Sequence, residues 1–132
     1  MPNPIQRALS AGVGALKAVN GVSVIIQRGS VQSAEAVTAI VGETEYEDID
    51  DQGIVISAKS RDYLIAAADY VLGADDIQTE PRNGDNIIET VGSTNFVYEV
   101  CRIPGQKHFR PSDPYGTTLR IHTRLTRTTP AA

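Results

Sequence analysis

Six carboxylic acids fall within the nine residues from position 43 to position 51, and they are the first candidates for chemistry. They are Glu43, Glu45, Glu47, Asp48, Asp50 and Asp51. A calcium loop requires oxygen ligands at fixed spacing, usually with a glycine at a set place, and that pattern is absent here. The other interpretations are a solvated hairpin tip and a loop placed in a functional channel or interface. We expect a long loop over about residues 42–53, between two strands.

A basic strand near the C-terminus is the second candidate. Leu119, Ile121, Thr123 and Leu125 alternate with Arg120, His122 and Arg124. Successive side chains of a β-strand point to opposite faces, so the pattern predicts a half-buried strand with a basic outer face. The outer residues Arg120, His122 and Arg124 are therefore candidates for an electrostatic subunit contact, either with the acidic stretch or with a partner ring.

Groups suited to catalysis are scarce. A nucleophilic mechanism requires a serine or cysteine within reach of an oriented histidine, and no known nucleophile motif contains His108 or His122. We interpret His122 as a surface or interface residue. The single cysteine, Cys101, lies in a strand-like context and is expected to be a buried or half-buried thiol. We therefore predict no enzymatic activity, no bound metal and no cofactor.

Length and charge limit the remaining classes of protein. A chain of 132 residues is expected to form one domain, residues 1–132, that buries a core without disulfides. The net charge of −4 argues against a nucleic-acid-binding surface, which is normally basic. Aromatic residues make up 5% of the chain and tryptophan is absent, so a platform that stacks bases is not expected. The longest apolar run is far shorter than a membrane span, and the N-terminus lacks a signal-peptide pattern.

The hydrophobic periodicity changes once along the chain. Helical spacing from Ile5 to Val19 predicts a helix over about residues 4–19. Alternating or β-branched segments then predict strands over residues 22–28, 36–41, 53–59, 87–91, 95–102 and 117–125. A helical turn or an irregular crossover is expected within residues 66–72. The predicted fold is a mainly β, small β-barrel of six or seven short strands over residues 22–125, with an N-terminal helix and a flexible tail at residues 126–132.

Five sequence segments, taken together in their order along the chain, resemble those of one viral protein family. They are Val22-Ser-Val-Ile-Ile-Gln-Arg28, Arg61-Asp-Tyr-Leu-Ile65, Pro81-Arg-Asn-Gly-Asp-Asn-Ile87, Phe96-Val-Tyr-Glu-Val100 and Ser112-Asp-Pro-Tyr-Gly-Thr-Thr-Leu-Arg-Ile-His-Thr123. In this order they resemble the head–tail joining (head-completion, or stopper) proteins of long-tailed bacteriophages. The resemblance implies a structural protein of the virion neck, made in the host cytoplasm and not membrane-bound. It also implies a homo-oligomeric ring below the portal and adaptor, which closes the DNA-filled head and docks the tail.

The resemblance also bears on the acidic stretch. In that family a long loop between early strands can project into the channel and retain DNA, and residues 43–51 fall in a comparable place. A carboxylate-lined channel repels the DNA backbone, so duplex DNA passes without sequence-specific binding. Two alternatives remain open. One is a tail-terminator or adaptor protein of the same assembly, and the other is a small β-barrel binding module.

Overall fold

The computed structural model describes residues 21–131, which form mainly β-strands, as the sequence predicts. The strands in chain order are β1 (Gly21–Arg28), β2 (Val31–Gln32), β3 (Val37–Ile49), β4 (Val55–Ala66), β5 (Val71–Leu72), β6 (Ile77–Gln78), β7 (Asn86–Val91), β8 (Thr94–Val100), β9 (Phe109–Pro111) and β10 (Thr118–Pro130). Residues 66–72, expected to form a helical turn or an irregular crossover, contain a 3-10 helix, η1 (Ala67–Asp69), and then strand β5. The helix expected at residues 4–19 lies outside the described residues.

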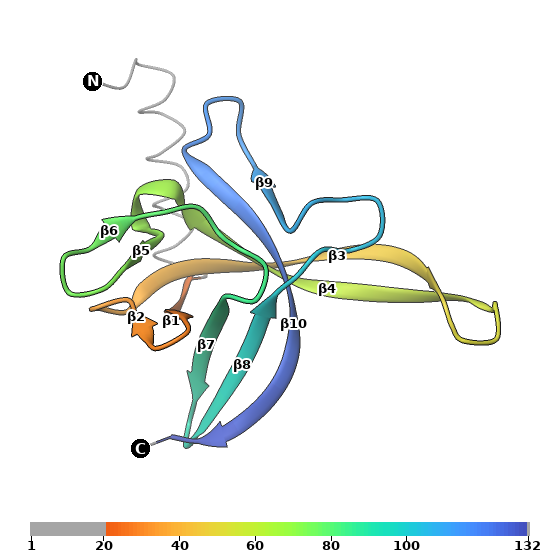
Figure 1. The fold of residues 1–132 in the computed structure, drawn as a ribbon, viewed down its shortest axis with the longest axis horizontal. Coiled ribbons are helices and arrows are strands. Elements are labelled where there is room, and N and C mark those ends of the chain that lie inside the picture. The colour runs from red at the N-terminus through yellow and green to blue at the C-terminus, as the bar shows by residue number, and fades with distance from the viewer. Residues whose placement is uncertain (1–20, 132) are drawn as a thin grey trace.

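The principal strands pair antiparallel in a path that returns to its first member. β1 pairs with β3 through Gly21–Val24 and with β7 through Val24–Gln27. The path then runs from β3 to β4, β10, β8 and β7, and so back to β1. Figure 1 shows these strands wrapping around one another in the body of the molecule.

Alternating apolar side chains of these strands build one core. Val24 and Ile26 of β1, Tyr63 and Ile65 of β4 and Ile121 of β10 are each at most 1% exposed. Members of each pair are two residues apart, which places them on the same face of a strand. This core holds the strands that carry the candidate site residues. No helix of residues 21–131 has the length and apolar character needed to cross a membrane.

Two strands are much longer than the sequence predicts. β3 and β4, of 13 and 12 residues, pair continuously from Ile40 opposite Leu64 to Ile49 opposite Val55. The predicted loop at residues 42–53 is therefore wrong, because most of the acidic stretch belongs to β3 and only its end forms a turn. The alternation of Glu43, Glu45 and Glu47 with less polar residues is a strand pattern that the high charge obscured.

The tail expected to be flexible from residue 126 is also ordered as strand. β10 continues to Pro130 and pairs with β8 along Thr94–Val100. The register shifts between Leu125 and Arg127, which marks a β-bulge or irregularity in the ladder. Leu125, predicted to face the core, is 50% exposed because it lies beyond Thr123, the last buried residue of the strand.

Candidate assembly site: a projecting arm and the polar cluster at its base

Strands β3 and β4 project beyond the other strands as a two-stranded hairpin. β1 pairs with β3 only as far as Ile40, and β10 pairs with β4 only from Arg61 onward. Residues 43–60, here called the arm, therefore have no other strand on either outer edge within the described part of the chain. Figure 1 shows the arm extending well away from the body. A projection of this kind places side chains within reach of another molecule.

The acids of the arm are divided between two faces and a turn. Directly opposed residues of an antiparallel pair share a face, so Glu43, Glu45 and Glu47 lie on the same face as Lys59. The Lys59 ammonium is 3.6 Å from a Glu43 carboxylate oxygen and 3.9 Å from one of Glu45. Asp48 lies on the opposite face. These surface ion pairs are exposed and contribute little to stability.

Asp50 shapes the turn at the end of the arm. Its carboxylate oxygen Oδ1 accepts hydrogen bonds from the backbone N–H groups of Gln52 and Ile54, each at 2.9 Å. Gly53 has a φ of 79°, a left-handed conformation that favours glycine. Asp51 is exposed, with no hydrogen bond to another described residue. No group of three or more His, Cys, Asp or Glu side chains among residues 21–131 is arranged to hold a metal ion.

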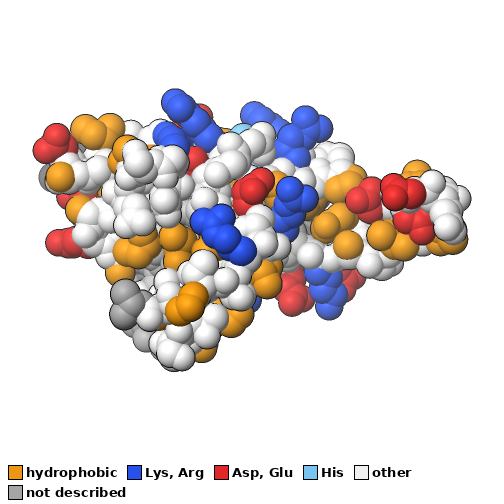
Figure 2. Space-filling view, turned by 60° about the horizontal axis from the view of Figure 1, so that its bottom comes forward, with side chains coloured by type: hydrophobic (Ala, Val, Ile, Leu, Met, Phe, Trp, Pro, Cys, Tyr) orange, Lys and Arg blue, Asp and Glu red, His pale blue; other side chains and the backbone are white. Residues whose placement is uncertain are grey.

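The tip of the arm also carries exposed aliphatic side chains, which the sequence analysis missed. Ile49 is 66% exposed, Ile54 56%, Val55 59% and Ile56 44%. Figure 2 shows hydrophobic side chains beside acidic ones on the projecting arm. In the sequence, the apolar segment Ile54-Val-Ile56 directly after an acidic turn could have indicated this exposed apolar surface. Contiguous exposed apolar groups mark interaction surfaces in soluble proteins.

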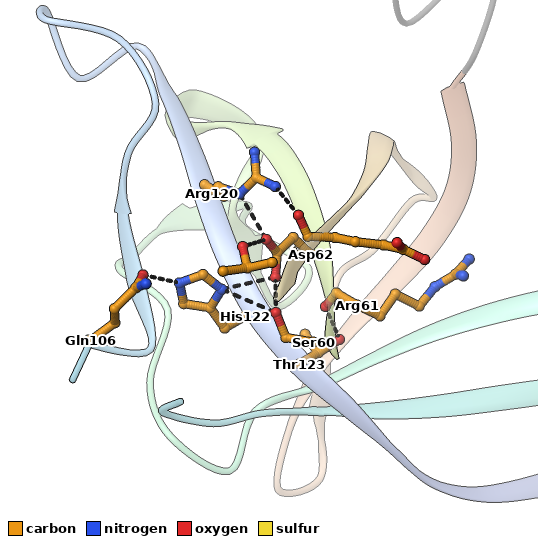
Figure 3. Close-up of polar contacts among 9 residues, drawn as sticks. Ser60, Arg61, Asp62, Gln106, Arg120, His122 and Thr123 are labelled. Carbon is orange, nitrogen blue, oxygen red and sulfur yellow. Dashed lines mark hydrogen bonds and ion pairs between the residues drawn. The ribbon is translucent and has the colours of Figure 1, made fainter. Parts of the chain in front are cut away.

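A buried carboxylate lies at the base of the arm, where β3, β4 and β10 meet. Asp62 is 0% exposed, and its oxygen Oδ2 accepts a hydrogen bond from Arg120 Nε at 2.7 Å and another from the Thr44 hydroxyl. Arg120 Nη2 also donates to the backbone carbonyl of Glu43 at 2.8 Å. Figure 3 shows Arg120 reaching across to Asp62 from the neighbouring strand. Arg120 thus links the body to the first residue of the arm.

Burial and hydrogen bonding act in opposite directions on Asp62. Removal from water raises the pKa of this carboxyl. Hydrogen bonds to the carboxylate lower the pKa by more than burial raises it, and they come from Ser60, Thr44, His122 and Arg120. The pKa of Asp62 in the folded protein is therefore below its ordinary value. The carboxylate is therefore the stable form, as a salt bridge to Arg120 requires. The hydrogen bonds of this cluster join the first residues of the arm to β10 of the body.

His122 belongs to this cluster and is not a surface residue. It is 0% exposed, with Nδ1 2.8 Å from Asp62 Oδ1 and Nε2 3.1 Å from Gln106 Oε1. The prediction of an exposed basic stripe is therefore wrong at His122. His122 does point away from the core face, but Asp62 lies directly opposite it in β4 and Gln106 covers the ring.

The cluster contains a serine, a histidine and an aspartate, but in an arrangement unsuited to nucleophilic catalysis. A catalytic histidine holds its aspartate at one ring nitrogen and takes the serine proton at the other. Here Ser60 Oγ and Asp62 both lie at Nδ1, with Ser60 3.5 Å away, and the Ser60 hydroxyl donates to Asp62 at 2.6 Å. Ser60 is also only 4% exposed. The geometry supports a structural network.

The other predicted site residue of β10 has a different environment. The Arg124 side chain is 69% exposed, and its Nη2 is 3.8 Å from a Glu99 carboxylate oxygen, at the limit of an ion pair. Arg120, Arg124 and His122 thus share a strand face, but Arg124 alone of the three is exposed. Cys101 is half-buried as expected, and desolvation raises the pKa of its thiol.

Two further buried carboxylates support the body. Asp85 accepts hydrogen bonds from Arg28 at 2.8 and 2.9 Å and from the Tyr70 hydroxyl at 2.6 Å. Burial raises the pKa of Asp85, but the hydrogen bonds from Arg28 and Tyr70 outweigh this and lower it. Glu89 similarly accepts from Arg61 at 2.7 Å and from the Tyr63 hydroxyl at 2.9 Å. All buried side-chain nitrogen and oxygen atoms of the described residues have a partner.

These features define a β-rich protein whose distinguishing element is a projecting arm fastened by an internal polar cluster. A sequence model of the phage head-tail joining protein family matches residues 3–130. The match covers nearly the whole chain, and the chain belongs to this family, as the sequence resemblance indicated. It is therefore a structural component of the connection between the head and the tail of a bacteriophage, at the neck of the virion. A search of curated proteins found no match.

Proposed function

We propose that this chain forms a homo-oligomeric ring below the portal and adaptor, where it closes the DNA-filled head and docks the tail. The observation that carries the proposal is the arm, residues 43–60, which leaves the body with neither outer edge paired to another strand of residues 21–131. Exposed strand edges favour unwanted pairing, and neighbouring subunits can cover them. Such an arm suits a protein whose partners surround it. Family membership supports the assignment to the neck.

The closed path of strand pairing supports a small barrel as the rigid body of each subunit. We infer that this barrel is formed by six strands, in the order β1, β3, β4, β10, β8 and β7. The order closes because β1 pairs both with β3 and with β7. Closure removes the edges of the body sheet, so that the free edges are concentrated in the arm. We propose that residues 1–132 act as one domain, and the part that the structure describes, residues 21–131, has one projecting element.

We further propose that Glu43, Glu45 and Glu47 face the channel through which DNA passes. They share one face of the arm with Lys59, which lies among them, whereas Arg61, opposite Glu43, pairs with Glu89 of the body. Repeated around a ring, this face presents like charges to the phosphate backbone, and water and ions screen them over roughly 8 Å. DNA then slides without binding. Asp48, Asp50 and Asp51 lie outside this face, so the channel role is restricted to the three glutamates.

A phage carrying a deletion of this protein tests the assignment to the neck. We expect filled heads and complete tails that do not join, with joining restored by the wild-type protein supplied in trans. Incomplete or irregular tails would instead assign the chain to the tail end as a terminator. Normal virions formed without the protein would reject the proposal.

Removal of charge tests the channel assignment separately. Changing Glu43, Glu45 and Glu47 together to glutamine should leave the particles assembled but alter DNA retention or ejection. A matched control removes three exposed acids of the body by Glu35→Gln, Asp75→Asn and Glu80→Gln, and it should behave as wild type. Equal behaviour of the two variants would reject a specific role for the arm glutamates.

A further inference from the structure

The aliphatic side chains at the tip of the arm are left exposed by the described part of their own chain. Ile49 and Val55 are opposite each other on one face, Ile56 lies on the other, and Ile54 is in the turn. All four are at least 44% exposed. A two-stranded hairpin is marginally stable alone in water, and no strand of residues 21–131 pairs with this one along the arm. An apolar tip on such a hairpin is suited to burial against another molecule.

Charge restricts the surface to which the tip can bind. Asp48 and Asp51 lie beside the aliphatic residues and are exposed, so the complementary surface must combine an apolar group with basic side chains. The end of β10 has this combination. Leu125 is 50% exposed, and Arg124 and Arg127 on either side of it are exposed as well.

Two other exposed aliphatic residues of the body, Ile77 and Val31, do not fit as well. Ile77 is 62% exposed, but it follows Asp75 and Asp76 directly and would bring like charges toward the acidic tip. Val31 lies on the same side, since its side chain is close to Gly73 in the turn before those acids. β10, by contrast, contains no acidic residue from Thr118 to Pro130, and the acid beside it is Glu99 of β8, 3.8 Å from Arg124 Nη2, while Arg127 lies further along the strand. Exposed basic side chains and an exposed apolar side chain are therefore found together at Leu125, Arg124 and Arg127.

We propose that the arm tip of one subunit binds a second copy of this chain over Leu125, with Asp48 and Asp51 facing Arg124 and Arg127. This deepens the ring proposed above and rests on it. The two surfaces are different, so the contact is heterologous, and repeating it in one direction generates a closed ring when the rotation allows. Glu43, Glu45 and Glu47 lie on the same face of the arm as Ile49 and Val55 but nearer the body, so in this arrangement they line the channel between the body and the contact.

Site-specific crosslinking in assembled particles identifies the molecule that the tip contacts. A photoreactive residue is introduced as Ile54→p-benzoylphenylalanine, and Ile77→p-benzoylphenylalanine provides a matched control at another exposed isoleucine. We expect irradiation of the first variant to give crosslinks between copies, located by mass spectrometry near Leu125, and the second to give none there. Crosslinks from position 54 to a different protein, or to another part of this chain, would overturn the proposal.

A charge exchange tests the same contact independently. Arg124→Glu with Arg127→Glu should reduce the amount of this protein in purified particles at least tenfold, and adding Asp48→Lys with Asp51→Lys should restore most of it. Failure of the exchange to restore incorporation, while each purified variant keeps the wild-type unfolding midpoint, would contradict the pairing. If the wild-type protein is absent from particles, the proposed neck function fails, and this contact fails with it.

Discussion

Asp62→Asn should destabilise the protein strongly, because the substitution removes the charge at the centre of the cluster that fastens the arm. Asparagine keeps one acceptor oxygen, but it leaves the Arg120 guanidinium without its carboxylate partner and places an amide nitrogen beside other donors. Breaking a buried ion pair costs about 3–5 kcal/mol. The Arg120 side chain is 22% exposed and is partly solvated, so we expect about 3 kcal/mol.

Urea unfolding at neutral pH measures this loss. With a slope of about 1.5 kcal/mol per molar urea, a loss of about 3 kcal/mol lowers the midpoint by about 2 M. Asp51→Asn is the matched control, since Asp51 is an exposed acid of the same arm, and its midpoint should shift by less than about 0.5 M. A shift for Asp62→Asn no larger than that of the control would refute a stabilising role for the cluster.

The pH dependence provides a second check on the same substitution. The pKa of Asp62 is lower in the folded protein than its ordinary value of 3.8. Its contribution to the free energy of unfolding is therefore fully present above about pH 4 and is lost as the pH falls toward the folded-state pKa. The difference between wild type and Asp62→Asn should accordingly shrink from pH 5 to pH 2. A difference that stays constant over this range would contradict the carboxylate assignment.

Three further substitutions test other parts of the structure. Tyr70→Phe removes the hydroxyl that donates to Asp85 at 2.6 Å and should cost about 1–2 kcal/mol in urea unfolding, without changing assembly. Asp50→Ala removes the acceptor of two backbone N–H groups in the arm's turn and should increase hydrogen exchange at the tip while the body stays protected. Gly42→Val places a Cβ 3.2 Å from the present position of Arg120 Nη2, so it should displace that side chain and lower incorporation into particles.

The local pattern of the sequence was sufficient to predict most of the body. The alternation from Leu119 to Thr123 correctly placed Leu119, Ile121 and Thr123 on the buried face, and the strand expected at residues 22–28 corresponds to β1. Such alternation follows directly from strand geometry. The short strands β2, β5, β6 and β9 were missed, since two or three residues carry no detectable period.

The polar cluster depended on partners that are far apart in the chain. Asp62 and His122 are separated by 60 residues, and only the register of β4 with β10 brings them together. No local pattern encodes that register, so the sequence alone predicts a surface position for His122. The arm was missed for a different reason. The high charge of residues 43–51 favours a loop, although their side chains alternate with the period of two that is typical of a strand. The aliphatic residues Ile54, Val55 and Ile56 fit the start of an ordinary strand equally well.

A reconstruction of the phage neck by electron cryomicroscopy tests the central claim most directly. We predict a closed ring between the portal and the tail into which the body of residues 21–131 fits, with each arm reaching the β10 of the next copy and its glutamate face toward the DNA channel. A neck resolved well enough to trace every chain, in which no ring has this fold, would contradict the account.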